Sequence, residues 1–545
     1  MDKKITKLGL LTLLAVIICG VAQAAPVEVA IFAINDFHGN LEPPPGGINI
    51  ADPAHPGKSF NIAAGGAERM ATLLKRLKAG HKNSVFVAAG DLVGASPVLS
   101  NQFHDEPTVE ALSRMGLEVS AVGNHEFDRG VAELLRLQRG GCHPGDDCRG
   151  RPPFKGARFH WLAASTMDRA TGNSILPPYY VKRFSGIPVA FIGLTLRDTA
   201  GFVAPAGVAG VEFRDEAQTV NALVPVLKAK GVKAIVVLIH QGGNTSGGIN
   251  DCAGFKGAIA DLVAKFDKAV DLVVSGHTHQ AYNCVIDGRH VTSAHRYGTL
   301  LTEIDLKLDR KTRDVASVTA SNLVVDPALP PDPAITRLIE SYRRRAGALN
   351  NRVIATLSAP LPAGTLTEES ALGDIVADAM RAASDHAQIA FMNPGGIRVA
   401  LPNAGPVTHG ELFAVLPFGN QIVTFDLTGA QIVALLEQQW SDPQLIRIMR
   451  VSQGFSYAWD GRRPAGQHVI AGSAMLNGSP LRPDAVYRVA VPDFLAQGGD
   501  GMTLFTQGNN SVMSGSLLDA LEAWLPSHAA ADGKPQGRIK RVDTP

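Results

Sequence analysis

Short, uninterrupted runs of valine, isoleucine and alanine recur between Val27 and Asp305, and a turn closes each run. Examples are Val29–Ile34, Val85–Val87, Ala234–Ile239 and Leu272–Val274. A strand that is apolar at every position is buried on both faces, so helices or a second sheet must cover it. Helical stretches such as Glu68–Leu77 lie between the runs. The pattern therefore predicts a layered α/β domain.

A proline-rich segment marks the end of this domain. Residues 325–332 read Val-Asp-Pro-Ala-Leu-Pro-Pro-Asp, which neither a helix nor a central strand accommodates. Pro333 then suits the first position of a helix, and an apolar stripe with helical spacing follows it. We expect a first domain over 25–325, a linker with a hinge helix over 326–350 (the helix itself over 333–350), and a second domain over 351–545.

The second domain has shorter elements separated by glycine-rich loops. A helix is expected over Leu372–Arg381, and strands are expected over Ile389–Met392 and Val486–Val491. Thr408 and Thr428 each open a capping box, in which a side chain three residues later bonds back to the start of a helix. We expect a smaller α+β domain.

The first 24 residues have the pattern of a cleavable export signal. Three lysines precede the apolar run Leu8–Val21, which ends at Ala22-Gln23-Ala24. The run is too short to span a membrane, and no later run reaches about 20 apolar residues. We expect an exported protein, periplasmic or secreted, without a membrane anchor.

Export leaves four cysteines in a compartment where disulfides form. Pairing Cys142 with Cys148 and Cys252 with Cys284 is the simplest of three connectivities, and buried free thiols are the alternative. The 51 basic and 50 acidic residues nearly cancel, which argues against a nucleic-acid partner held by bulk charge.

Five polar clusters follow strands of the first domain. They are Asp36-Phe37-His38, Gly90-Asp91, Gly123-Asn124-His125-Glu126, His240 and Gly276-His277-Thr278-His279. The carboxyl ends of strands are where open α/β folds form their sites. A single histidine there is usually a core or rim residue, but five of the sixteen histidines share this one kind of position.

These residue types fit divalent metals. Imidazole and carboxylate ligands without thiolate suit zinc, manganese or similar ions. In an extended segment, residues i and i+2 point the same way, so Asp36 and His38 can share one metal, as can His277 and His279. The set exceeds what one tetrahedral ion needs, which suggests two metals bridged by a carboxylate; a single catalytic zinc is the alternative.

These motifs, in this order, resemble the calcineurin-like metallophosphatases. In the second half, the segments Asn393–Arg398, Leu416–Gly419 and Phe494–Gly501 resemble the bacterial 5′-nucleotidase family, which includes UDP-sugar hydrolase and ecto-5′-nucleotidase. The resemblance spans nearly the whole chain after the leader. It implies an α/β/β/α sandwich joined by a helix to a smaller nucleotide-binding domain.

The resemblance also implies roles for individual residues. One metal would be held by Asp36, His38, Asp91 and His279, and the other by Asp91, Asn124, His240 and His277. His125 would be catalytic, with Asp128 as its partner. The base would lie between Phe418 and Phe494, with Asn393 against the base, Arg398 on phosphate and Asp500 on ribose hydroxyls. Without the resemblance, the two phenylalanines would be interpreted as core residues.

One segment departs from the family pattern. Well-characterised relatives carry an arginine just before the helix that begins near Gly373, whereas Thr365–Gly373 contains no arginine and two glutamates. A second phosphate-binding arginine is therefore not expected there. Substrate choice is expected to differ from that of the best-known members.

The residues and the resemblance together imply an exported two-metal phosphohydrolase. It would release phosphate from small-molecule nucleoside 5′-monophosphates, with metal-bound hydroxide as the nucleophile. Alternatives on the same scaffold are a 2′,3′-cyclic nucleotide phosphodiesterase, a UDP-sugar or dinucleotide pyrophosphatase, and a sulfur-ester hydrolase. A more distant alternative is a non-catalytic nucleotide-binding surface protein. The sequence leaves the oligomeric state open.

Overall fold

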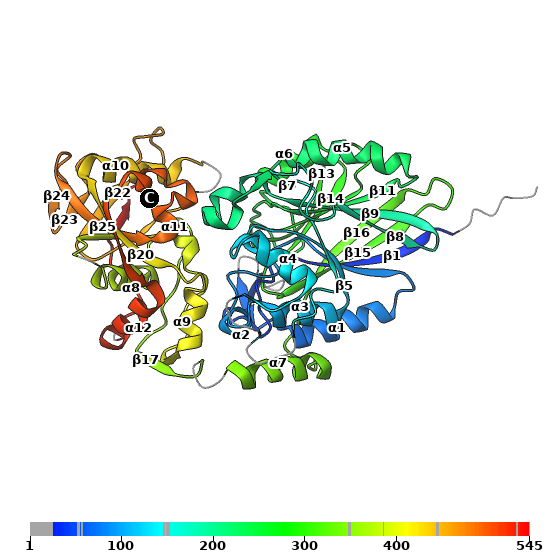
Figure 1. Cartoon of the computed structure of the whole chain (residues 1–545), viewed down its shortest axis with the longest axis horizontal. Coiled ribbons are helices and arrows are strands. Elements are labelled where there is room, and N and C mark those ends of the chain that lie inside the picture. The colour runs from blue at the N-terminus through cyan, green and yellow to red at the C-terminus, as the bar shows by residue number, and fades with distance from the viewer. Residues whose placement is uncertain are drawn as a thin grey trace, which may run out of the picture.

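A computed structural model places the chain in two domains (Figure 1). It describes residues 25–51, 55, 58–144, 148, 153–346, 350–384, 386–442, 446–529 and 532–543. The predicted export signal, residues 1–24, lies outside the described residues. In the part of the chain that is described, no helix combines the length and the apolar character needed to cross a bilayer.

Two six-stranded sheets form the N-terminal domain. The first contains β1 (Val27–Ile34), β4 (Ser84–Ala88), β5 (Leu117–Ala121), β6 (His160–Leu162), β15 (Leu300–Leu308) and β16 (Val315–Val324), in the order β16-β15-β1-β4-β5-β6. The second contains β8 (Tyr179–Phe184), β9 (Ile187–Thr195), β11 (Ala234–His240), β12 (Leu272–Ser275), β13 (Ala281–Ile286) and β14 (Arg289–Ala294), in the order β13-β14-β12-β11-β9-β8. Alternate apolar side chains of both sheets, such as Val29 and Val236, form one shared core.

Helices cover the outer face of each sheet. The first sheet is covered by α1 (Ala67–Ala79), α3 (Glu106–Met115), α4 (Val131–Arg139) and α7 (Pro333–Ala346). The second is covered by α5 (Glu216–Ala229) and α6 (Ala258–Lys265). The predicted α/β/β/α sandwich is therefore confirmed, because strands that are apolar at every position need cover on both sides.

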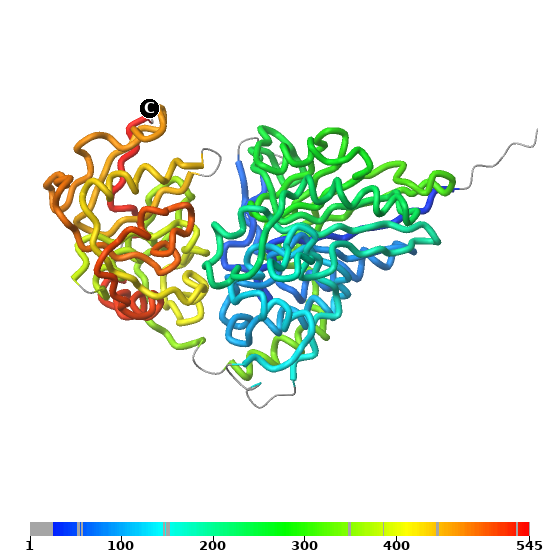
Figure 2. Tube along the Cα trace, turned by 45° about the horizontal axis from the view of Figure 1, so that its top comes forward, coloured from blue at the N-terminus to red at the C-terminus, as the bar shows by residue number. Residues whose placement is uncertain are grey.

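The linking helix, α7, packs on the N-terminal domain (Figure 1, Figure 2). The described part of its predicted apolar stripe, up to Ala346, is buried against α1 and α3, and the Tyr342 hydroxyl donates to Glu110. Asp332 caps the helix by accepting the backbone N–H groups of Ala334 and Ile335. The described helix ends at Ala346 and residue 350 lies in a turn, so the helix does not reach its predicted end.

The C-terminal domain is a mixed α+β unit. Its main sheet contains β18 (Ile389–Met392), β20 (Gln421–Thr428), β21 (Arg450–Val451), β25 (Val486–Pro492) and β26 (Asn509–Ser516), in the order β21-β18-β25-β20-β26. On one face lie α8 (Ala371–Ala382), α9 (His409–Val415) and α12 (Leu517–His528), and on the other lie α10 (Gly429–Glu437) and β22 (Phe455–Trp459). Both predicted capping boxes are present, at Thr408 and Thr428.

Short elements complete the fold. They are β2 (Ile48–Ala51), β3 (Ser59–Ile62), α2 (Val98–Asn101), β7 (Thr166–Asp168), β10 (Val211–Phe213), β17 (Val353–Leu357), β19 (Gly405–Thr408), β23 (Met475–Leu476), β24 (Ser479–Pro480), α11 (Asp493–Ala496) and β27 (Ile539–Arg541). The two disulfides pair as predicted, Cys142 with Cys148 and Cys252 with Cys284. The second disulfide ties the loop after β11 to β13.

Candidate active site

A cavity of about 1840 Å³ lies between the two domains. The residues that follow β4, β5 and β12 line one wall of it, which includes Asp91, Asn124, His125, His277 and His279. The opposite wall includes all five residues predicted to bind substrate, Asn393, Arg398, Phe418, Phe494 and Asp500. The structure thus brings the ends of the N-terminal strands opposite the loops of the C-terminal domain.

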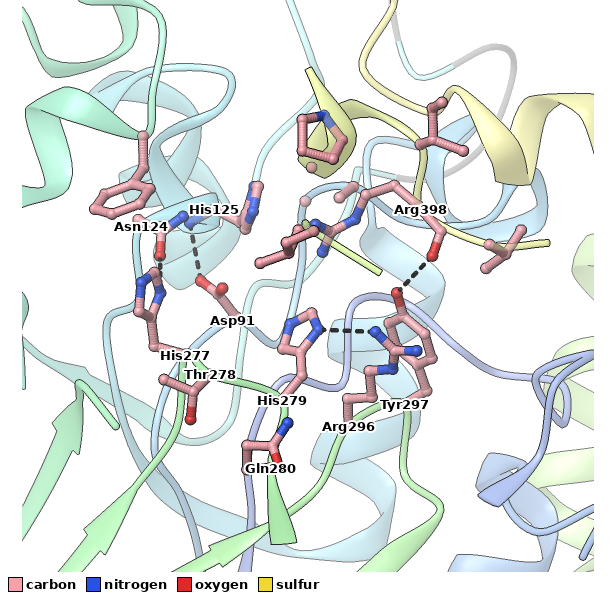
Figure 3. A pocket seen from close by; sticks show the side chains of 18 of the residues that line it. Asp91, Asn124, His125, His277, Thr278, His279, Gln280, Arg296, Tyr297 and Arg398 are labelled. Atoms are coloured by element: carbon pink, nitrogen blue, oxygen red, sulfur yellow. Dashed lines mark hydrogen bonds between the residues drawn. The ribbon is translucent and has the colours of Figure 1, made fainter. Parts of the chain in front are cut away.

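Two groups of side chains in this region could each hold a metal ion. The first is Asp36, His38 and His279, and the second is Asp91, His240 and His277; in each group the candidate ligand atoms lie within 4.8 Å of one another. Asn124 joins the second group, since its Oδ1 lies 3.0 Å from Nδ1 of His277 (Figure 3). One oxygen of Asp91 lies 2.9 Å from Nε2 of His240 and 3.6 Å from Nε2 of His38, so this carboxylate reaches both groups.

His277 and His279 fall in different groups, as the family resemblance implies and not in the single group that their i, i+2 spacing allows. A shared direction of residues i and i+2 requires extended backbone. His277 and His279 instead have positive φ angles of 72° and 56°, and Asp36 and His38 have 50° and 46°. Alternate side chains share a direction only in a strand, so in these left-handed turns the spacing does not decide which group a residue joins. Asp36 and His38 do share a group.

Buried Glu126 holds together the two turns that carry Asp91 and Asn124. Its carboxylate accepts hydrogen bonds from the backbone N–H groups of Asp91, Leu92 and Gly123, at 3.0, 2.7 and 2.6 Å. Burial and the charge of Asp91 raise the pKa of Glu126 to about 7. A Cβ on Gly123 would lie 2.2 Å from a carboxylate oxygen of Asp91, so the close approach of the two turns requires glycine there.

The nitrogen atoms at the centre fit a divalent cation. Nδ1 of His38 lies 2.9 Å from the Gly94 carbonyl and Nδ1 of His240 lies 2.8 Å from the Ala89 carbonyl. When each Nδ1 donates its proton to that carbonyl, Nε2 keeps a lone pair for a metal. Nε2 of fully buried His240 has no hydrogen-bond partner among the described residues, although it lies 2.9 Å from Asp91.

The first group shows the same convergence. Nε2 of His38 and Nε2 of His279 face each other at 3.1 Å, and burial lowers the pKa of both imidazoles well below its usual value. Nε2 of His279 also lies 3.3 Å from an oxygen of Asp36. Neutral imidazoles and a carboxylate converging on one point are the donor set of a zinc or manganese site.

His125 lies beside the two groups and pairs with Asp128. Its Nδ1 is 2.9 Å from an Asp128 oxygen, and its backbone N–H donates to Asp91 (Figure 3). Although burial lowers it, the charges of Asp128 and Asp91 raise the pKa of His125 above its ordinary value. A protonated His125 would place a positive charge beside a site where negative charge can develop.

Arg398 extends from the C-terminal domain to the metal groups, with Nη2 3.5 Å from Nε2 of His38. Its guanidinium lies 5.6 Å from the ring centre of Phe418, which in turn stacks on His125 with ring centres 5.7 Å apart. Asn393 donates a hydrogen bond to Asp500 at 3.0 Å. The five residues thus share one wall, whereas the stacking of Phe418 and Phe494 on a common base stays a prediction.

Several charged or aromatic residues of the cavity were missed by the sequence reasoning, among them Arg296, Tyr297 and Arg447. Arg296 approaches Nδ1 of His279 at 3.3 Å, and the Tyr297 hydroxyl donates to the backbone carbonyl of Arg398 across the domain boundary (Figure 3). Both lie within three residues of the end of β14, so the rule applied to the other strand ends could have found them. Arg447 lies in a loop before β21 that carries no recognisable motif.

Two family profiles match the chain. The calcineurin-like phosphoesterase profile matches residues 29–281, and that of the 5′-nucleotidase C-terminal domain matches residues 353–507. Endonuclease YhcR of Bacillus subtilis is 34% identical over 96% of this chain, which covers 42% of that protein. Cell wall protein Lmo0130 of Listeria monocytogenes is 31% identical over 90% of this chain, which covers 65% of that protein.

The likeness extends to solved structures. The crystal structure of a 5′-nucleotidase precursor from Thermus thermophilus matches with a TM-score of 0.78 and 29% identity, covering 95% of this chain and 100% of that one. The two profiles fall on the two domains, and the structural match spans both. The chain therefore belongs to the 5′-nucleotidase family, in which a calcineurin-like phosphoesterase domain precedes a C-terminal 5′-nucleotidase domain.

Proposed function

We propose that the protein is a metal-dependent phosphohydrolase that releases phosphate from nucleoside 5′-monophosphates. The observation that carries this proposal is the convergence of two buried ligand groups, linked through Asp91, on a cavity whose other wall holds Arg398 and two phenylalanines. Asp36, His38, Asp91 and His279 would hold one metal, and Asp91, Asn124, His240 and His277 the other. Bound there, zinc or manganese supplies Lewis-acid polarisation of a phosphoryl oxygen and lowers the pKa of water.

The side chains around the metal groups would stabilise the phosphoryl group in transfer. Because Nδ1 of His125 is paired with Asp128, its Nε2 is the atom left to donate a hydrogen bond to a phosphoryl or leaving-group oxygen. One such donor in a preorganised site contributes about 3–4 kcal/mol to transition-state binding. Arg398, on the His38 side, would hold a phosphate oxygen through a charge-assisted hydrogen bond.

The C-terminal wall would hold the nucleoside. Phe418 and Phe494 would stack on the base, which is worth about 1–3 kcal/mol per base in nucleic-acid sites and tolerates any base. Asp500 would accept hydrogen bonds from ribose hydroxyls, with Asn393 beside it. The two disulfides support an exported, periplasmic or secreted enzyme, since such bonds persist in oxidising compartments.

The size of the cavity favours a second candidate, hydrolysis of phosphodiesters. Its volume of about 1840 Å³ exceeds the roughly 300–1,000 Å³ of a typical small-molecule pocket. Residues of β2, β3 and the loop 244–251 extend it beyond the metal groups, where a second alcohol portion of a diester would fit. One relative is itself named an endonuclease.

Hydrolysis of AMP, UDP-glucose and 2′,3′-cyclic AMP, with Mn²⁺ or Zn²⁺ supplied and the products separated by chromatography, tests both candidates. For His125→Ala we expect kcat on AMP to fall about 100-fold while metal content and adenosine binding stay unchanged. His528→Ala, on the exposed side of α12, is the matched control. Turnover of 2′,3′-cyclic AMP or UDP-glucose without turnover of AMP would favour the second candidate. No turnover of any of the three would refute both.

A further inference from the structure

The C-terminal wall of the cavity carries two cations among its described residues, Arg398 and Arg447. Arg398 belongs to the proposed phosphate site, whereas Arg447 has no role there. We propose that Arg447 is a substrate-binding and specificity-determining residue, which binds the anionic part of the nucleotide between the ribose and the metal groups. The inference rests on the proposed function and names the residue that would select charged nucleotides over nucleosides.

The site encloses Arg447, but its neighbours do not occupy all of its hydrogen-bond donors. Its side chain is 14% exposed, and its Nε lies 3.6 Å from an oxygen of Asp500. That separation is longer than a hydrogen bond, and a guanidinium has five N–H donors, so donors remain for another acceptor. A phosphate group, with several oxygen acceptors, matches this fork geometry.

A neighbouring arginine shows what a structural role looks like in the same segment. Arg450 is 1% exposed, and its guanidinium donates to the backbone carbonyls of Ile448 and Thr365. The bond to Thr365 fastens β21 to the segment 365–366. Arg447, three residues earlier, lines the cavity instead, so the two side chains serve different purposes.

The backbone that carries Arg447 is fixed on its C-terminal side. The N–H of Ile448 donates to the Leu366 carbonyl at 2.8 Å, and the N–H of Met449 donates to the Gln439 side chain at 2.7 Å. Ile448 and Met449 are fully buried. Arg447 is therefore presented from a rigid base, which lowers the entropy cost of binding a ligand through it.

Arg447 lies on the opposite side of the metal groups from Arg398. Its guanidinium carbon is 5.2 Å from the ring centre of Phe202, in the N-terminal domain, and Phe202 meets the ring of His277 at 5.0 Å. Arg398 instead approaches His38, in the other group. With Asp500 as its second neighbour, Arg447 stands between the proposed ribose site and the metal group of His277.

Two structural roles compete with this inference. Arg447 could merely orient Asp500, or it could merely clasp the domains together by stacking on Phe202. Either role would affect a neutral nucleoside as much as a nucleotide. Direct contact with phosphate, in contrast, would leave adenosine binding unchanged and weaken binding in proportion to phosphate charge.

Calorimetric binding to the full chain loaded with Mn²⁺ separates these roles, with every variant made in the His125→Ala background so that turnover of AMP is slowed during the titration. The ligands are adenosine, AMP and the methylene-bridged analogue of ADP, which cannot be hydrolysed between its phosphates. For Arg447→Gln we expect Kd for AMP and the ADP analogue to rise about tenfold or more, the loss of one charge-assisted hydrogen bond. Kd for adenosine should stay within about twofold.

Three further variants complete the design. Arg447→Lys keeps the charge but not the fork, so its loss of AMP affinity should be smaller than that of Arg447→Gln. Arg463→Gln, at an exposed position of the same domain, should match the His125→Ala parent for all three ligands. Phe202→Leu removes the stacking partner and should leave the preference for AMP over adenosine in place.

The inference is overturned if Arg447→Gln weakens adenosine as much as AMP, if it changes no Kd, or if Phe202→Leu reproduces its whole profile. The proposed function fails by a different observation, namely a wild-type protein that binds AMP without hydrolysing it. In that case the binding series still reports on Arg447.

Discussion

The two walls of the cavity differ in how firmly their side chains are held. Asp36, His38, Asp91 and His240 are at most 1% exposed and come from or directly follow strands of two packed sheets. Arg398, Phe418, Phe494 and Asp500 are half-buried on the opposite wall. Buried ligands cannot shift without disturbing the core, whereas loop residues can be exchanged at little cost. If the proposed function holds, the comparison implies that chemistry is fixed in one domain and substrate choice is adjustable in the other.

Asp91→Asn is expected to have the largest effect, because this carboxylate reaches both ligand groups. Losing several kcal/mol of metal-dependent stabilisation should lower kcat about 10³-fold or more. The metal content of the protein, measured by inductively coupled plasma mass spectrometry, should fall together with kcat. Asp261→Asn, on the exposed side of α6, is the control. A fully active Asp91→Asn enzyme with its metals in place would contradict the idea that the buried ligands of the N-terminal wall fix the chemistry.

Asp128→Asn should have the next largest effect. It removes the charge that pairs with His125 but leaves a side chain of the same shape. The loss of a charge-assisted hydrogen bond, about 1.5–3 kcal/mol, should lower kcat on AMP about 10–100-fold with KM unchanged. Steady-state kinetics measures the split, and a rise in KM alone would place Asp128 in substrate binding instead.

Phe494→Ala tests the C-terminal wall of the cavity, where substrate choice is proposed to be adjustable. Loss of one stacking surface should raise KM for AMP about tenfold, with kcat within about threefold. The KM for p-nitrophenyl phosphate, which lacks a nucleoside, should not change. An equal rise for both substrates would mean that Phe494 supports the wall rather than the base.

The smallest effect is expected from Asp374, a buried carboxyl group of the C-terminal domain that is 1% exposed. One oxygen accepts the N–H of Gln536, and burial raises the pKa of Asp374 to about 7, with Arg538 opposing the shift and Glu369 adding to it. An unfolded aspartate titrates near about 3.9. The stability contributed by Asp374 is therefore full below about pH 4 and is lost as the pH rises through about 7.

The Tm of Asp374→Asn should consequently rise relative to that of the wild type as the pH rises from about 5 to about 8. Each kcal/mol of unfolding free energy that the wild type loses should add about 2–4 °C to this difference in Tm. Asp460→Asn is the control, because Arg462 holds the pKa of Asp460 at about 2 and its contribution is constant over that range. Melting curves at several pH values measure the difference. A gain that shrinks toward pH 8 would contradict the assignment.

The sequence predicts the N-terminal wall of the cavity better than the C-terminal wall. Asp36, Asp91, Asn124 and His240 could be found because a buried strand reveals itself by its apolar run, and the residues after the run must lie at the sheet edge. Residue spacing alone could not assign His277 and His279 to different groups, since left-handed turns are not visible in it. Arg447 could not be found, because a single arginine on a loop acquires its neighbours only when Phe202 and Asp500 meet it in the fold.

Five of the seven proposed metal ligands, Asp36, His38, Asp91, His277 and His279, occupy left-handed backbone, a conformation that is uncommon outside glycine. Such strain persists only where the surroundings impose it. Anyone transplanting this centre onto another scaffold would therefore have to copy the loops before the ligands. The same five side chains placed in the same order on ordinary helices or strands would point in different directions and would not converge on the metal sites.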